Sequence, residues 1–91
     1  MKLIFCHPKY GHISVAENET VIEKGQYEGL TQEELFEKIM TEGYGGKVSP
    51  IFLTEFEDGH TERILMNEAK DLIHRTGVLE VVVVAPIAGG K

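Results

Sequence analysis

Val78-Leu79-Glu80-Val81-Val82-Val83-Val84 is the most apolar segment of the chain. Its nearly continuous run of apolar residues predicts a strand with neighbours on both sides, in the middle of a sheet. Successive side chains of a strand point to opposite faces. Only one of the sets Val81/Val83 and Val82/Val84 can therefore point into the core, and the other set must face outward.

Four upstream segments carry the alternation of polar and apolar residues, or the short apolar run, that is typical of strands. The predicted strands span 2–7, 12–17, 51–56 and 61–66. Turn residues from Pro8 to Gly11 and the dipeptide Asp58-Gly59 predict that they form two hairpins. The segment 18–29 between the first hairpin and the helix fits either a further short strand or an irregular connection.

One helix has a complete set of sequence signals. Thr31 and Glu34 form a capping box, in which each side chain accepts a hydrogen bond from the backbone N–H of the other residue. The apolar stripe that follows consists of Leu35, Phe36, Ile39 and Met40. Gly43 is placed to end the helix with a positive φ. A second, short helix is predicted from Asn67 to Arg75.

The predicted order is β-β-α-β-β-(short α)-β, which indicates the α+β class. We expect a mixed sheet of four to five strands with the main helix across one face. The chain has 91 residues, and a chain of this size can build one hydrophobic core. We divide it into a folded domain, residues 1–85, and a flexible C-terminal tail, residues 86–91.

Composition narrows the class of partner. Nine Lys and Arg residues against fifteen Asp and Glu residues give a net charge of −6. This charge disfavours binding to nucleic acid or to an anionic membrane surface, and no apolar run reaches the length of a membrane span. The single cysteine, Cys6, cannot form an intrachain disulfide, and the N-terminus lacks a signal peptide. A cytoplasmic protein with a protein partner is expected.

The sequence offers little catalytic or metal-binding chemistry. Cys6 and His7 are adjacent in a strand and point to opposite faces, so they cannot form a nucleophilic pair. His12 could approach His7 across the hairpin, but two ligands do not make a stable metal site, and surface histidines are the better interpretation. We therefore expect no metal, no bound cofactor and no catalytic residue in this chain.

The last strand leads into Ala85-Pro86-Ile87-Ala88-Gly89-Gly90-Lys91. Six extended residues, from Ala85 to Gly90, reach about 20 Å beyond a sheet. Glycines 89 and 90 have no side chains, so such a tail can enter a tunnel that is too narrow for any other residue. This pattern favours a protein whose terminal carboxylate is a substrate of another enzyme.

The stretch from Val81 to Gly90 resembles the C-terminus of ubiquitin-like sulfur-carrier proteins. These include the small subunit of molybdopterin synthase and the carriers of thiamine, cysteine and methionine biosynthesis. The motif covers about the last ten residues, and the element order is similar to the β-grasp fold of this family over most of the chain. The longer 18–29 segment departs from the family pattern.

The resemblance implies a mechanism. An ATP-dependent adenylating enzyme activates the carboxylate of Gly90, and a persulfide or sulfide converts it to a thiocarboxylate. The thiocarboxylate then donates sulfur in the active site of a biosynthetic enzyme. Residues 86–89 (Pro86, Ile87, Ala88 and Gly89) would lie in the partner's active-site channel, and the exposed set of the valine strand, Val82 and Val84, would dock partners.

Lys91 departs from the family pattern, because the carriers end at the second glycine. Three explanations are open. A peptidase, for example a metallopeptidase, removes Lys91, or the residue was added for expression, or the tail is not used in this way. Two other functions stay open. One is a ubiquitin-like modifier that forms an isopeptide bond through Gly90, and the other is a non-covalent interaction module.

Overall fold

A computed structural model describes residues 1–44 and 48–85. The strands are β1 (Lys2–His7), β2 (Gly11–Ala16), β3 (Ile51–Phe56), β4 (Thr61–Leu65) and β5 (Val78–Val84), and the α-helix is α1 (Gln32–Glu42). Three 3-10 helices complete the described part: η1 (Gly25–Tyr27), η2 (Met66–Glu68) and η3 (Leu72–His74). No helix in these ranges combines the length and the apolarity that crossing a bilayer requires.

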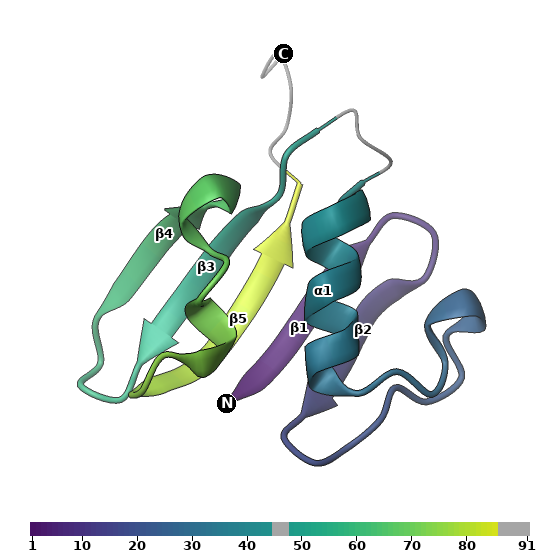
Figure 1. The fold of residues 1–91 in the computed structure, drawn as a ribbon, viewed down its shortest axis with the longest axis horizontal. Helices are drawn as coiled ribbons and strands as arrows, with labels where there is room; N and C mark the ends of the chain where they lie inside the picture. The colour runs from purple at the N-terminus through teal and green to yellow at the C-terminus, as the bar shows by residue number, and fades with distance from the viewer. Residues whose placement is uncertain (45–47, 86–91) are drawn as a thin grey trace.

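The strands form one mixed sheet in the order β2-β1-β5-β3-β4 (Figure 1). β1 and β5 are parallel, and the other neighbouring pairs are antiparallel. The prediction that 78–84 is the central strand is therefore confirmed, as are both hairpins. The parallel β1–β5 pair brings the C-terminal ends of these two strands to the same edge of the sheet.

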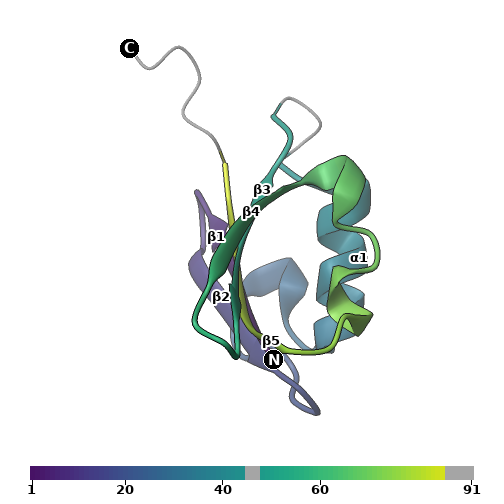
Figure 2. The same ribbon diagram turned by 90° about the vertical axis from the view of Figure 1, so that its left-hand side faces the viewer.

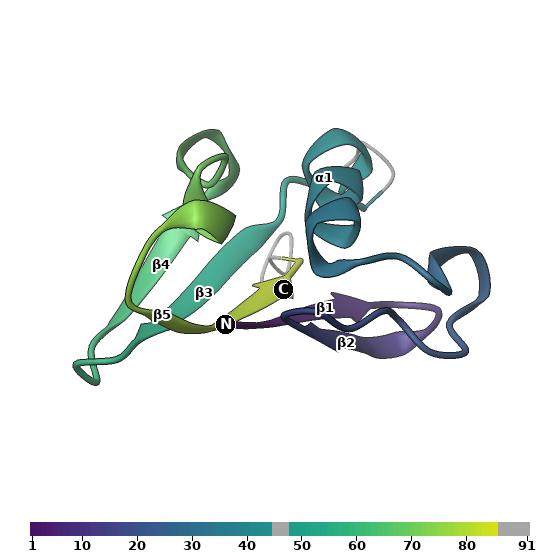
Figure 3. The same cartoon turned by 60° about the horizontal axis from the view of Figure 1, so that its bottom comes forward.

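Among residues 1–44 and 48–85, helical segments cover one face of the sheet and leave the opposite face, here called the bare face, without a covering element. Figure 2 shows α1 and the segment that carries η2 and η3 on the same side of the sheet, and Figure 3 shows the same arrangement from below. Neither the 18–29 segment nor the 66–75 segment lies over the opposite face. The architecture is α+β, with one main helix on a five-stranded mixed sheet, and is consistent with the β-grasp fold.

The core lies between the covered face of the sheet and α1. Sheet residues at its centre are less than 2% exposed: Leu3, Phe5, Ile13, Phe52, Val81 and Val83. The predicted stripe of α1 packs against them through Leu35, Phe36 and Ile39, which are also buried. Each such aliphatic or aromatic side chain contributes about 1.5–3 kcal/mol by its removal from water.

Helix α1 begins as its sequence predicts. The backbone N–H of Glu34 donates to Oγ1 of Thr31 at 3.2 Å, and the backbone N–H of Thr31 donates to Oε1 of Glu34 at 2.9 Å. At the other end, Gly43 has a positive φ of 53° and its N–H donates to the carbonyl of Ile39. The side-chain amide of buried Gln32 donates to the carbonyls of Met1 and Val15 and so fastens the helix start to the first hairpin.

The predicted short helix from Asn67 to Arg75 is wrong in its type. The structure has two single 3-10 turns, η2 and η3, and no side chain caps either of them. The buried residues of this segment are Ala69, which follows η2, and Leu72, which begins η3. A segment of nine residues is also too short to form an α-helix without strong tertiary support.

The 18–29 segment is the irregular connection and not a further strand. It contains η1 and a single bridge between Thr20 and Thr31. Val21 and Tyr27 are buried and join the core cluster. The additional length of this segment therefore extends the core on the helix side of the sheet and leaves the bare face free.

Candidate functional site

The predicted reactive end of the chain lies outside the described residues. This applies to Pro86, Ile87, Ala88, Gly89, Gly90 and Lys91. Ala85 is the last described residue and is exposed at the end of β5. The structure therefore places two parts of the candidate site, namely the edge of the sheet at which β5 ends and the bare face beside it.

The valine strand divides its side chains between the two faces as expected. Val81 and Val83 are 0% exposed and point into the core, whereas Val82 and Val84 are only partly buried. The two predicted docking residues therefore lie on the bare face. Their outward orientation follows from the burial of Val81 and Val83, because neighbours in a strand cannot share a face.

Neighbouring strands extend the apolar surface around these two valines. Val82 lies between Ile4 of β1 and Leu53 of β3, and Leu53 is 42% exposed. Val84 lies opposite Ile51, which is itself buried at 7% exposed and pairs on its other side with Leu65, which is 51% exposed. We call these six residues the apolar face. They are Ile4, Ile51, Leu53, Leu65, Val82 and Val84.

The sequence predicted only two members of the apolar face. The alternation in 51–56 indicates which residues of that strand point outward, but not which strand lies beside it. Ile4, Leu53 and Leu65 join the valines through the strand order and the register of the sheet. Sequence periodicity and turn geometry constrain the register within a hairpin, but they do not specify the strand order that places β5 between β1 and β3.

Charged residues border the apolar face on the side away from the end of β5. Glu80 pairs with Lys2 on one side and with Glu55 on the other. Two carboxylates directly opposite each other in a sheet destabilise it slightly. Leu53, Val82, Glu55 and Glu80 also line part of a shallow hollow of about 350 Å³ on the bare face. The bare face is therefore apolar at the end from which the tail leaves and charged at the far end.

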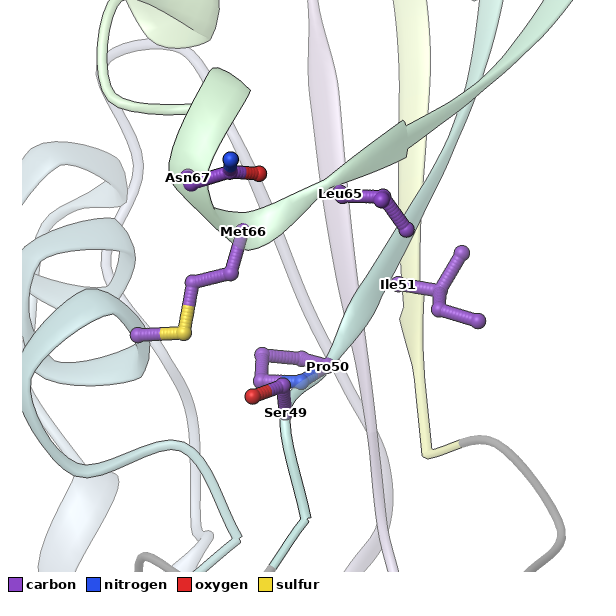
Figure 4. A pocket seen from close by; sticks show the side chains of 6 residues that line it. All are labelled: Ser49, Pro50, Ile51, Leu65, Met66 and Asn67. Carbon is purple, nitrogen blue, oxygen red and sulfur yellow. The ribbon is translucent and has the colours of Figure 1, made fainter.

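A groove continues the apolar face around the edge of the sheet (Figure 4). Its volume is about 550 Å³ and its lining is mostly apolar. The lining residues are Ser49, Pro50, Ile51, Leu65, Met66 and Asn67. Ile51 and Leu65 belong to both surfaces, so a partner that covers Val84 also meets this groove.

The side chain of Tyr44 connects the C-terminal ends of β1 and β5. Its hydroxyl lies 2.8 Å from the carbonyl oxygen of Cys6 and 3.2 Å from that of Val83. Its ring lies against Phe5, with 5.2 Å between the ring centroids. Burial, with smaller contributions from Cys6 and Tyr27, raises the pKa of Tyr44 to about 12, so the hydroxyl keeps its proton at physiological pH.

Tyr44 did not emerge from the sequence as a candidate. The glycines on either side of it, Gly43 and Gly45, predict only a flexible connection after the helix. An aromatic residue among glycines is the one signal that the sequence offers, and it does not identify the contact. The two carbonyls that the hydroxyl meets are 38 and 39 residues away in the chain.

Cys6 and the first two histidines do not form a reactive group. The register places His12 opposite Cys6 and His7 opposite Gly11, so His7 and His12 are not a cross-strand pair. Nδ1 of His7 accepts hydrogen bonds from the backbone N–H groups of Lys9 and Tyr10. Burial raises the pKa of the Cys6 thiol and lowers that of His7, which favours the uncharged form of both.

A separate cluster of charges lies at the tip of the second hairpin. The His60 ring is hydrogen-bonded through Nδ1 to Asp58 and through Nε2 to Glu62, and it stacks on Phe56. The hydrogen bonds to Glu62 and Asp58 raise the pKa of His60. Arg75 contacts Glu62 at 3.6 Å and lies over the Phe56 ring. These contacts fasten the hairpin tip to the segment before β5.

Over residues 1–44 and 48–85, no group of three histidine, cysteine or acidic side chains is arranged to hold a metal ion. Comparisons of the chain with protein-family models, with curated proteins and with solved structures give no significant match.

Proposed function

We propose that this chain is a sulfur-carrier protein whose reactive atom is the carboxyl group of Gly90. The observation that carries this proposal is the position of the sequence Pro86-Ile87-Ala88-Gly89-Gly90 directly after the central strand of the sheet. A slim segment that starts at a fixed edge suits a group that must reach into another protein's active site. The bare apolar face beside this edge supports docking of that protein.

The first step is activation by an ATP-dependent adenylating enzyme. A carboxylate is a poor electrophile, so one of its oxygens attacks the α-phosphorus of ATP and pyrophosphate leaves. The product is a mixed anhydride between Gly90 and AMP. All the catalytic groups for this step belong to the adenylating enzyme, and this chain supplies the carboxylate as a cosubstrate.

The second step introduces sulfur. A sulfide ion attacks the carbonyl carbon of the adenylate, AMP leaves with the bonding electrons, and a thiocarboxylate remains. If the donor is a protein persulfide, its terminal sulfur forms an acyl disulfide, and a second thiol must then reduce the S–S bond to release the thiocarboxylate. In the active site of a biosynthetic enzyme the sulfur would be transferred to the substrate, and water would supply the oxygen that restores the carboxylate of Gly90.

Adenylation requires a free carboxyl group on Gly90, so the Gly90–Lys91 bond must first be cleaved. A peptidase, for example a metallopeptidase, would supply this activity. The chain would act in the cytoplasm, where adenylating enzymes and reduced sulfur donors are available. Its acidic net charge of −6 would favour encounter with partners that have a basic docking surface.

The test compares the full chain with a chain that ends at Gly90. Each adenylating enzyme of the ubiquitin-activating class in the source genome is purified and assayed by ATP–pyrophosphate exchange. We expect exchange only with the chain that ends at Gly90. A matched control carries Gly89→Leu in that chain, which keeps the carboxylate but adds a side chain, and should lose activity. Equal exchange with the full chain would refute the requirement for cleavage.

Intact mass distinguishes the sulfur carrier from the modifier. After addition of a sulfur donor, a carrier gains the mass difference between sulfur and oxygen. A ubiquitin-like modifier instead appears in conjugates of higher mass, linked through lysine side chains of other proteins. A chain without either product, whose partners still bind after deletion of residues 86–91, would be a non-covalent interaction module.

A further inference from the structure

We infer that Tyr44 is a positioning residue for the proposed adenylation, because it fixes the direction in which the chain leaves the end of β5. This inference rests on the proposed function. The structure supports it through three features of the described residues: the position of the hydroxyl, the anchoring of the ring, and the place of the contact relative to the apolar face.

The hydroxyl of Tyr44 lies where the ladder between β1 and β5 ends. The last pair of residues in register in this ladder is Phe5 and Val83. The hydroxyl then meets the carbonyl oxygens of Cys6 and Val83 at 2.8 and 3.2 Å. A single O–H group that is shared between two strands ties their ends together at the last pair of the β1–β5 ladder, while Val84 is still paired with Ile51 of β3.

The aromatic ring of Tyr44 is also anchored by packing. It packs on Phe5, whose own side chain is 1% exposed, and burial keeps the hydroxyl protonated as a hydrogen-bond donor. Tyr44 directly follows Gly43, whose N–H ends α1 on the carbonyl of Ile39. The helix, the core and the root of the tail are therefore connected through one side chain.

The contact also lies beside the apolar face. Tyr44 acts on Val83, and the next residue, Val84, is a member of that face. A partner that binds the apolar face therefore receives a tail whose starting direction is already set. Loosening the root of the tail widens the range of positions from which the carboxyl group starts, so fewer encounters are aligned for reaction.

The variant that isolates this role is Tyr44→Phe, which removes the hydroxyl and keeps the ring. It is made in the chain that ends at Gly90, and Tyr27→Phe is the matched control. Tyr27 contacts the same Phe5 ring and is more deeply buried than the partly buried Tyr44, and among the described residues its hydroxyl makes no hydrogen bond. Both variants are assayed well below their melting temperatures.

We expect Tyr44→Phe to lower kcat for adenylation by about three- to tenfold, with KM within about twofold of the unmodified chain, since loosening the root lowers the effective concentration of the carboxylate in the active site. Amide hydrogen exchange at Val84 and Ala85 should become about tenfold faster, the factor expected for one lost hydrogen bond. Tyr27→Phe should leave both readouts unchanged. A purely structural role would lower the melting temperature and leave kcat unchanged.

Two results separate the inference from the function on which it rests. If the unmodified chain that ends at Gly90 is adenylated and Tyr44→Phe matches its kcat, the positioning role is overturned and the sulfur-carrier proposal stands. If no adenylating enzyme activates the unmodified chain, the proposed function fails. In that case unchanged exchange at Val84 and Ala85 in Tyr44→Phe would also overturn the structural part of the inference.

Discussion

Val82→Ala and Val83→Ala form a matched pair that tests the division of the valine strand between core and docking face. The two residues are adjacent in β5 and lose the same two methyl groups. Val83 is 0% exposed within the core, whereas Val82 is partly buried on the bare face. The same chemical change should therefore affect stability at one position and partner binding at the other.

The expected loss of stability in Val83→Ala follows from the burial of the Val83 side chain. Two carbon atoms lost from the core cost about 0.8 kcal/mol each in transfer free energy. A cavity on the order of 40 Å³ adds about 1 kcal/mol. The free energy of unfolding should thus fall by about 2.5 kcal/mol, which lowers Tm by roughly 10–20 °C in a domain of this size. Val82→Ala should cost less than about 1 kcal/mol, because it opens no closed cavity.

Thermal denaturation followed by circular dichroism measures the first effect, and titration with the adenylating enzyme measures the second. Val82→Ala should weaken binding by about fivefold, since about 1 kcal/mol of apolar contact is lost on the partner's side. Val83→Ala should bind normally at temperatures where it is folded. Equal losses of stability in the two variants, or weaker binding in Val83→Ala alone, would refute the assignment of faces.

Three further predictions concern the fold. Gln32→Ala leaves the carbonyls of Met1 and Val15 without their side-chain donor and should lower the free energy of unfolding by about 2–3 kcal/mol in urea denaturation. Thr31→Ala removes the cap of α1 and should cost about 1 kcal/mol by the same measurement, with Thr20→Ala as a control outside the helix. The hydrogen bonds to Glu62 and Asp58 raise the pKa of His60, so the folded state favours the charged imidazolium. The resulting stabilisation is complete below pH 6.5, the ordinary pKa of histidine, and is lost as the pH rises through the raised pKa. Tm should therefore fall across this window, and His60→Gln should flatten the decrease; an identical pH profile for the variant would contradict this contribution.

Elements with strong local signals could be predicted from the sequence. The two hairpins follow from alternation and turn chemistry, and α1 follows from the capping box between Thr31 and Glu34. The central place of 78–84 follows from its apolar character, because only a strand with neighbours on both sides buries both of its faces in part. For the hairpins and α1, the free energy that selects the structure depends on residues that are close in the chain.

The parts that the sequence could not provide depend on long-range contacts. The 67–75 segment carries helix-forming residues, yet its Ala69 and Leu72 must both reach the core from a connection between two strands, and 3-10 turns achieve this. The contact of Tyr44 with Val83 requires that α1 and β5 are already packed. The apolar face likewise exists only after the register has placed Leu53 beside Val82.

Strand β5 determines both the docking surface and the starting point of the tail in the proposed mechanism. Because β5 lies in the middle of a sheet with only one covered face, the burial of Val81 and Val83 obliges Val82 and Val84 to face outward. The same strand carries the chain to the edge where Tyr44 joins it to β1. A partner that binds the apolar face is therefore in contact with the strand from which the tail continues. In the proposed mechanism, β5 thus determines both where the partner docks and where the tail with the Gly90 carboxylate begins. A change in the direction of the chain at the end of β5 would then reduce catalysis without weakening the docking.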